Sequence, residues 1–170
     1  MSEPVSGPVV GPVVRRARPE DLETVGELTV AAYAEFTDGP DDSYIALLRD
    51  APRRDREAEL WVAEVDGVVL GSVTIALPGS PWREIGQDGE GEFRMLAVSP
   101  DARRMGVGDA LARFVLDRFR ELGLTSVVLS SLSSMSSAHR IYERLGYHRI
   151  PDRDWSPQPG VDLIAYAKDL

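Results

Sequence analysis

Cysteine is absent from the 170 residues of this sequence. That absence excludes disulfide bonds, thiolate metal sites and a cysteine nucleophile, and it is typical of proteins from a reducing compartment. Histidine is scarce as well, because His139 and His148 are the only two and their spacing does not form a ligand pair on one helix. We therefore expect no metal cofactor, and the chemistry of the protein has to use other groups.

Long apolar runs are also missing, since no stretch of 18 apolar residues occurs in the chain. Residues 1–12 lack the basic flank and the apolar stretch that mark a signal peptide. The sequence therefore predicts a cytoplasmic protein that makes no membrane contact.

Positive charge is in the minority, with 19 Lys and Arg against 28 Asp and Glu, for a net charge of −9. Binding to nucleic acid needs a clustered positive surface, so we expect no nucleic-acid partner. An acidic surface can attract cationic partners, but it is also a common route to solubility, and that second explanation is the simpler one.

The chain is long enough for one hydrophobic core and too short for two, with 43% hydrophobic residues. Residues 1–12 hold three prolines and two glycines without periodicity, which predicts a mobile tail before a single domain at 13–170. Periodicity in that domain predicts strands at 13–17, 60–65, 68–76, 92–98, 127–129, 147–150 and 161–167, and helices at 19–36, 41–50, 106–122 and 138–145. This order predicts an α/β fold with a mixed sheet covered by helices on both faces.

The segment Arg103-Arg104-Met105-Gly106-Val107-Gly108 lies between a predicted strand and a predicted helix. A turn that enters a helix presents unpaired backbone N–H groups and the positive end of the helix dipole, which together bind phosphate. Gly106 and Gly108 would let a pyrophosphate approach the backbone, and the two arginines add positive charge. An ordinary loop with two exposed arginines explains the same residues equally well.

Other catalytic and phosphate-binding motifs fit worse. A dinucleotide fingerprint would need a third glycine where Leu111 stands, and neither G-x-x-x-x-G-K-[ST] nor G-x-S-x-G occurs.

Two motifs together resemble the GNAT superfamily of N-acetyltransferases. Leu96-Ala97-Val98 leads into Arg103-x-x-Gly106-x-Gly108, which is similar to the family's [QR]-x-x-G-x-[GA] signature. The stretch from Ala138 to Tyr147, which contains Tyr142-Glu143-Arg144-Leu145-Gly146, is similar to its second motif. The resemblance covers residues 13–170 and implies a mixed, mostly antiparallel sheet of six to seven strands flanked by about four helices, with acetyl-CoA as co-substrate.

The resemblance also implies a set of cofactor-binding residues. Backbone groups of Leu96, Ala97 and Val98 would hold the pantetheine arm. The pyrophosphate would fall to the loop and first helical turn that follow, which comprise Arg103, Arg104, Met105, Gly106, Val107, Gly108 and Asp109. One departure concerns Met135, because many relatives carry an asparagine at that position, and the neighbouring serines are better explained as helix caps.

Two side chains are the expected catalytic residues. Tyr142 aligns with a tyrosine that in many relatives protonates the departing thiolate, and a phenol with a pKa near 10 is protonated at neutral pH. Its position on an apolar helix stripe is equally what a core residue would show. Glu92 is the candidate base for an amine nucleophile; the alternative is a solvated glutamate at a strand edge, with Glu90 nearby.

The resemblance predicts transfer of an acetyl group from acetyl-CoA to a primary amine of a small molecule or peptide, by direct attack in a ternary complex. Two alternatives stay open: a non-catalytic CoA-binding or protein-interaction module of the same fold, and a different acyl donor. A homodimer is compatible with the sequence. The family layout would place the acceptor between residues 33–50, 82–87 and 151–160, whose acids (Asp38, Asp41, Asp42, Glu84, Asp152 and Asp154) could attract a cation.

Overall fold

The structure is a computed structural model that describes residues 11–39 and 42–170. The predicted tail lies outside the described residues except for Gly11 and Pro12. The strands are β1 (Val13–Arg16), β2 (Glu59–Val65), β3 (Val68–Ala76), β4 (Glu90–Val98), β5 (Ser126–Leu132), β6 (His148–Arg149), β7 (Trp155–Gln158) and β8 (Val161–Asp169). The α-helices are α1 (Leu22–Tyr33), α2 (Ser43–Arg49), α3 (Ala51–Glu57), α4 (Val107–Glu121) and α5 (Ser136–Arg144).

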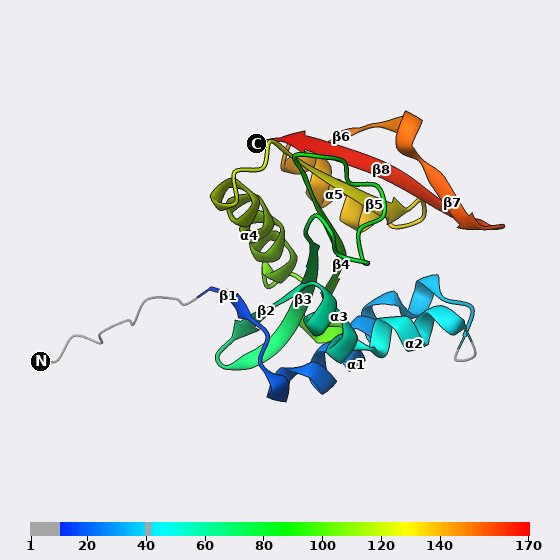
Figure 1. Cartoon of the computed structure of the whole chain (residues 1–170). Helices are drawn as coiled ribbons and strands as arrows, with labels where there is room; N and C mark the ends of the chain where they lie inside the picture. Colours follow the sequence, from blue (N-terminus) through cyan, green and yellow to red (C-terminus); the bar gives the residue numbers. More distant parts are fainter. Residues whose placement is uncertain (1–10, 40–41) are drawn as a thin grey trace, which may run out of the picture.

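All eight strands form one sheet, in the order β1-β2-β3-β4-β5-β8-β6, with β7 added beside β8 (Figure 1). Every pairing is antiparallel except that of β4 with β5. The predicted fold class is confirmed. The strand beyond the six to seven expected is β7, which contains Pro157 and pairs with β8 only at Trp155 and Gln158. So short and irregular a pairing leaves no alternating pattern in the sequence.

The turn between β2 and β3 forms as its two residues predict. Asp66 and Gly67 have φ angles of 50° and 80°, the positive values that a two-residue hairpin of this kind requires. The hairpin therefore fixes the register of β2 on β3.

The β4–β5 pairing is the short junction of the sheet. Only three residues of each strand pair, from Glu90 with Ser126 to Glu92 with Val128, after which β5 continues along β8 alone. Beyond that point β4 contains a bulge, where Met95 has a φ of 52° and the register with β3 shifts. Within residues 11–39 and 42–170, the edge of β4 that faces β5 thus has no strand partner from Phe93 to Val98.

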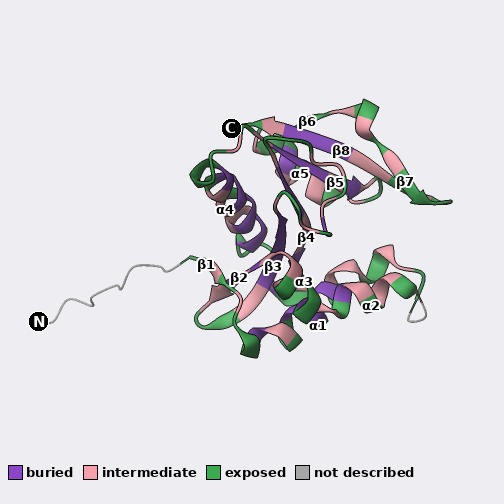
Figure 2. Ribbon diagram, viewed as in Figure 1, coloured by how far each residue is buried: buried purple, intermediate pink, exposed green. Residues whose placement is uncertain are grey.

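Helices cover both faces of the sheet, as Figure 2 shows, with buried residues along the central strands. On one face, α4 and α5 pack on a cluster that includes Val73, Phe93 and Leu111. On the other face, α1, α2 and α3 pack on two smaller clusters, one around Leu60 and one around Trp82. Among the described residues, no helix is long and apolar enough to cross a bilayer.

Helix α3 was not expected, since its sequence APRRDRE is mostly charged. It begins after Asp50, whose carboxylate accepts a hydrogen bond from the Arg53 backbone N–H at 3.1 Å, and Pro52 is compatible with a first helical turn. Ala51 and Arg54 are its buried residues. A buried arginine gives no apolar signal, so periodicity could not find this helix.

Candidate active site

Helix α4 begins at a glycine in the left-handed conformation. Gly106 is its N-cap with a φ of 77°, and no side chain caps the helix. The first helical hydrogen bond runs from the Ala110 N–H to the Gly106 carbonyl at 3.0 Å. The N–H groups of Val107, Gly108 and Asp109 therefore point out of the helix end without a partner within the helix, which is the arrangement that binds anions.

Two arginines precede this helix end. Arg103 and Arg104 are exposed, and neither forms an ion pair with any part of the chain that the structure describes. Arg104 has a φ of 67°, so the loop turns sharply where it meets the helix. Asp109 differs, because its carboxylate pairs with Arg144 of α5 and not with the loop. The Asp109 group that remains available to bind phosphate is its backbone N–H.

The position of the helix end depends on a glycine that sequence reasoning did not single out. A Cβ at Gly71 of β3 would lie 2.6 Å from Val107 Cγ1 and 3.0 Å from the Ala97 carbonyl oxygen. Only a residue without a side chain lets the first turn of α4 approach the sheet this closely. The strand pattern of residues 68–76 carries no sign of this contact, because it arises between distant segments.

The residues expected to hold the pantetheine arm lie on the free edge of β4. Leu96 and Val98 pack against the cluster under α4, while Ala97 is buried and pairs with Ser72 of β3. The opposite edge of this segment has no strand partner, so an extended ligand could add to it as a strand would. The structure thus brings the predicted strand segment and the predicted phosphate loop together at one end of β4.

Tyr142 lies on α5 with its side chain buried against the sheet. Its ring centroid is 5.9 Å from that of Phe93, 5.6 Å from Tyr147 and 6.0 Å from Tyr166. Burial raises the pKa of the Tyr142 phenol, with a smaller effect from Tyr166, so the hydroxyl keeps its proton at neutral pH. The residue is both a core aromatic and a protonated acid beside the free edge of β4.

Helix α5 begins without the serine cap expected from the sequence. Met135 occupies the N-cap position and no side chain caps the helix. The Ser136 backbone N–H bonds to the Ser134 carbonyl instead, at 2.9 Å. The expectation of a serine cap was therefore wrong.

Glu92 is placed differently from a base at an exposed strand edge. Its side chain is fully buried, and its carboxylate accepts hydrogen bonds from the backbone N–H groups of Glu84, Ile85 and Gly86 at 2.7 to 3.1 Å. These donors occupy the carboxylate oxygens, and the buried side chain does not reach solvent. This geometry fits an anchor for the loop between β3 and β4, and it does not favour the base role, direct or through water, that was expected for Glu92.

That loop is held at a second point. Arg153 pairs with Glu90 at 2.7 Å and also donates to the Ile85 carbonyl. Together with Glu92, this contact ties residues 84–86 to the body of the protein from two sides. Sequence reasoning missed it because the partners are 63 and 68 residues apart.

A cluster of polar side chains lies on the α1–α3 face, where β4 leaves β5. We call it the acceptor cluster, and it consists of Tyr33, Tyr44, Glu84 and Arg94. Arg94 Nε pairs with Glu84 at 2.9 Å, and its guanidinium lies over the Trp82 ring at 5.4 Å. Burial raises the pKa values of both tyrosines and of Glu84. The acids predicted to attract a cation include only one member of this cluster, Glu84.

The acceptor cluster approaches Tyr142 across the sheet. Phe93 of β4 packs against Tyr142 on one face of the sheet. The next residue of β4, Arg94, pairs with Glu84 on the other face. Residues from both faces therefore meet at the free edge of β4.

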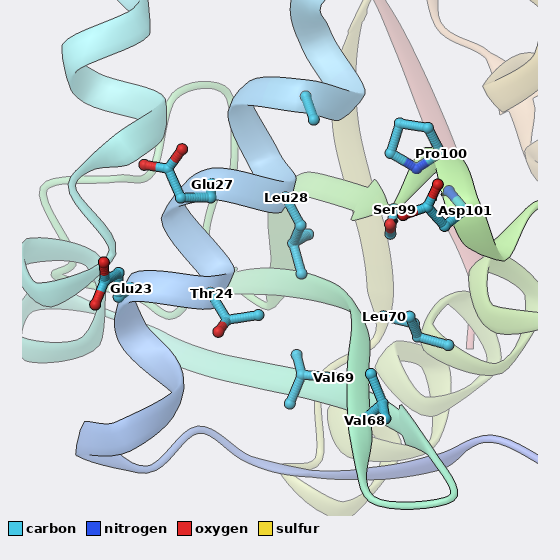
Figure 3. Close-up of a pocket in the computed structure, with 11 residues that line it drawn as sticks. Glu23, Thr24, Glu27, Leu28, Val68, Val69, Leu70, Ser99, Pro100 and Asp101 are labelled. Carbon is cyan, nitrogen blue, oxygen red and sulfur yellow. Dashed lines mark hydrogen bonds between the residues drawn. The ribbon is translucent and has the colours of Figure 1, made fainter.

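A groove of about 580 Å³ lies between α1, the start of β3 and residues 99–101 (Figure 3). Leu28, Val68, Val69 and Leu70 give it an apolar lining, and Glu23, Glu27 and Asp101 contribute carboxylates. None of residues 103–109 lines it. Its acidic groups would repel a phosphate, so the groove is separate from the anion site at α4.

Comparison with known proteins identifies the family. The model of the acetyltransferase (GNAT) family matches residues 22–147, well over half of the chain. A mycothiol acetyltransferase from Cellulomonas flavigena is 37% identical over 134 residues, and human N-acetylaspartate synthetase is 31% identical over 103 residues. These matches cover 69% and 61% of this chain but only 38% and 32% of the relatives, so the chain spans about a third of their length.

Solved structures share the fold. The ribosomal-protein-S18-alanine N-acetyltransferase from Escherichia coli has a TM-score of 0.68 at 18% identity, covering 93% of each chain. The Salmonella typhimurium protein YncA, solved with its cofactor acetyl-CoA, has a TM-score of 0.66 at 21% identity, covering 95% of each chain. Sequence and fold agree, and the chain belongs to the GNAT family of acetyltransferases.

Proposed function

We propose that this protein transfers an acetyl group from acetyl-CoA to a primary amine by direct attack in a ternary complex. The observation that carries the proposal is the capless N-terminus of α4 beside the free edge of β4, because a phosphate-binding helix end and an unpaired strand edge together fit a nucleotide with an extended arm. The names of the two sequence relatives point to different acceptors, so they support acetyl transfer without selecting a substrate.

Each end of the proposed cofactor site has its own donors. The N–H groups of Val107, Gly108 and Asp109 would bind the pyrophosphate, with Arg103 and Arg104 adding positive charge. The edge of β4 from Leu96 to Val98 would pair with the pantetheine arm. Acetyl-CoA supplies the thioester, and every other requirement of the reaction falls to residues of the chain.

The reaction forms a C–N bond between the amine and the acetyl carbonyl and breaks the C–S bond. The amine must lose a proton to solvent water before it attacks, and the thiolate must gain one as it leaves. Tyr142 is the proposed proton donor, since its phenol is protonated and adjoins the free edge of β4. Glu92 is the proposed positioning residue, because its carboxylate holds the loop that carries Glu84. Glu84 presents its own carboxylate on the side from which the amine would enter.

The experiment is a calorimetric titration with acetyl-CoA of the wild type and two variants. Gly106→Glu places a bulky negative charge at the proposed pyrophosphate site, and Gly123→Glu places the same group at the other end of α4. The two glycines have φ angles of 77° and 74°, and a Cβ on either meets nothing within 4 Å. Backbone strain is therefore matched between the variants.

We expect the wild type and Gly123→Glu to bind acetyl-CoA with micromolar affinity and Gly106→Glu to lose binding. Acetyl transfer to a panel of amines would then be measured with the wild type. Equal binding by both variants would contradict the proposed cofactor site. Tight binding without transfer to any amine would instead favour the non-catalytic CoA-binding module.

A further inference from the structure

In the acceptor cluster, groups that donate hydrogen bonds outnumber groups that accept them. Tyr33 and Tyr44 each carry a phenolic hydroxyl, and Arg94 carries a guanidinium whose Nε binds Glu84 and whose Nη1 donates to the Trp82 carbonyl at 3.3 Å. The side chain of Arg94 is 14% exposed and that of Glu84 is 19% exposed, so both reach solvent. A ligand can therefore touch this cluster from outside.

A second guanidinium lies behind the cluster without enough partners. Arg54 is fully buried, and its Nη1 donates to the carbonyls of Leu47 and Leu48 at the end of α2. Its Nε and Nη2 have no hydrogen-bond partner among the described residues. Buried donors without acceptors are rare and costly in native proteins, particularly on a charged group.

The nearby carboxylates do not supply what is missing, because each already binds other donors. Asp50 accepts the Arg53 N–H at the start of α3, and Glu57 binds Arg53 and the Trp82 indole. Glu84 pairs with Arg94, and Glu92 accepts three backbone N–H groups. Two donors of Arg54, Nε and Nη2, are therefore left without a hydrogen-bond acceptor among the described residues.

The protonation states of the side chains in this region also make them hydrogen-bond donors. Burial lowers the pKa of Arg54 to about 10, so its side chain is still protonated at neutral pH. Burial raises the pKa values of Tyr33 and Tyr44, and the positive charges of Arg54 and Arg94 oppose this with a smaller effect, so both phenols stay protonated and can donate. Two cations and two neutral donors thus converge on one region.

The cluster also has the correct position to select the acceptor. Arg94 is the second residue of β4 after its last pairing with β5, and its neighbour Phe93 packs against Tyr142 on the other face of the sheet. The Glu84 carboxylate is partly exposed, and it can face an ammonium group. The region therefore offers one site for a cation beside several donors for an anion.

We propose that the acceptor is a primary amine that also carries a carboxylate, as in a free amino acid. Its carboxylate binds Arg94 and the hydroxyls of Tyr33 and Tyr44 in front of Arg54, and its amino group lies beside Glu84. This inference rests on the proposed acetyl transfer and narrows its substrate class. It adds an anionic group to the primary amine expected from the sequence.

The test compares carboxylated amines with their decarboxylated counterparts, in the pairs phenylalanine with phenethylamine, tryptophan with tryptamine, histidine with histamine and lysine with cadaverine. Binding to the CoA-loaded protein is measured by calorimetry, and acetyl transfer is measured separately. We expect the carboxylated member of at least one pair to bind about tenfold more tightly, as a charge-assisted contact would provide.

Variants assign that preference to residues. Tyr44→Phe removes one donor and Arg94→Gln removes one charge, and each is expected to weaken binding of the carboxylated amine about tenfold while changing its decarboxylated counterpart less than twofold. Arg56→Gln, on the exposed side of α3, is the matched control and should change neither. Thermal unfolding of each variant checks that it is folded.

The binding arm separates this inference from the proposed function. Selective binding of carboxylated amines without acetyl transfer would overturn the proposed reaction and leave the ligand class standing. Acetyl transfer with equal or better binding of decarboxylated amines would overturn the ligand class alone. Equal losses for both members of a pair in Arg94→Gln and Tyr44→Phe would also contradict it, because the residues would then act through the fold.

Discussion

Tyr142 and Tyr147 are two buried phenols on the same side of the sheet, 5.6 Å apart between ring centroids. Both rings pack against Phe93, with centroids at 5.9 Å for Tyr142 and 6.5 Å for Tyr147. Of the two hydroxyls, that of Tyr147 is the one fully buried without a hydrogen-bond partner among the described residues. Replacing either tyrosine by phenylalanine therefore removes the same hydroxyl group from a different position.

Tyr142→Phe is expected to lower kcat about 10²-fold, because it removes the proton donor for the leaving thiolate. Tyr147→Phe is expected to leave kcat unchanged, and it should not reduce the free energy of unfolding since an unpaired buried hydroxyl is lost. Steady-state kinetics with acetyl-CoA and thermal unfolding of both variants provide the measurement. Similar kcat values for the two variants would rule out the acid role of Tyr142.

Asp21 contributes to the pH dependence of the free energy of unfolding in the acid range. The Arg15 guanidinium, at 2.7 Å, is the main cause of its lowered pKa, with burial opposing and the Arg18 backbone N–H assisting. Because the folded-state pKa is below the unfolded value near 3.9, the stabilisation is complete above that pH and is lost as pH falls through the folded-state pKa. Asp21→Asn should cost about 2 kcal/mol at pH 7 and flatten the acid limb of stability. Denaturant unfolding from pH 2 to 7 measures this, with Glu20→Gln as the exposed control.

Residue roles were predictable where they depend on local sequence, and not where they depend on distant partners. The loop ending in Gly106 could be recognised because a glycine before a helix has a local meaning. The environment of Glu92 could not, because its three donors are backbone groups of a loop whose path no pattern in the sequence records. The cluster around Arg94 depends in the same way on α1, α2 and β4 folding together.

At the scale of elements, the contact between β3 and α4 sets the geometry of the proposed anion site. Gly71→Ala would place a methyl group 2.6 Å from Val107 Cγ1 and displace the first turn of α4. We expect a loss of about 1–3 kcal/mol in the free energy of unfolding and weaker acetyl-CoA binding. Gly11→Ala is the control, since a Cβ there would meet nothing within 4 Å and the residue lies outside the proposed anion site. An unchanged acetyl-CoA affinity in Gly71→Ala would contradict this coupling.

Elements with a regular apolar pattern were predicted to within a few residues, and those without one were missed. The helix expected at 106–122 is α4 at Val107–Glu121, and the hairpin of β2 and β3 forms around Asp66-Gly67 as expected. Helix α3 and strand β7 were missed because one buries an arginine and the other contains a proline. Tertiary contacts, and not periodicity, hold both in place.

At the scale of the whole molecule, the proposed cofactor would bridge the two parts of the sheet. A ligand that binds only the folded state at 100 times its Kd stabilises it by about 2.7 kcal/mol. For a chain of this size we expect acetyl-CoA to raise the Tm by about 5–10 °C. A thermal melt with and without acetyl-CoA measures the shift, and Gly106→Glu should show none. A comparable shift in that variant would place the binding site elsewhere.

The three-residue junction between β4 and β5 divides the sheet into two parts that can unfold separately. Strands β1 to β4 pair only with neighbours at residues 13–98, and strands β5 to β8 pair only among residues 126–169, apart from that junction. Each part can thus lose or regain its backbone hydrogen bonds as a cooperative unit. Amide hydrogen exchange should then show two groups of protected amides with different opening free energies, and the three paired residues at Glu90 to Glu92 should exchange with the less stable group.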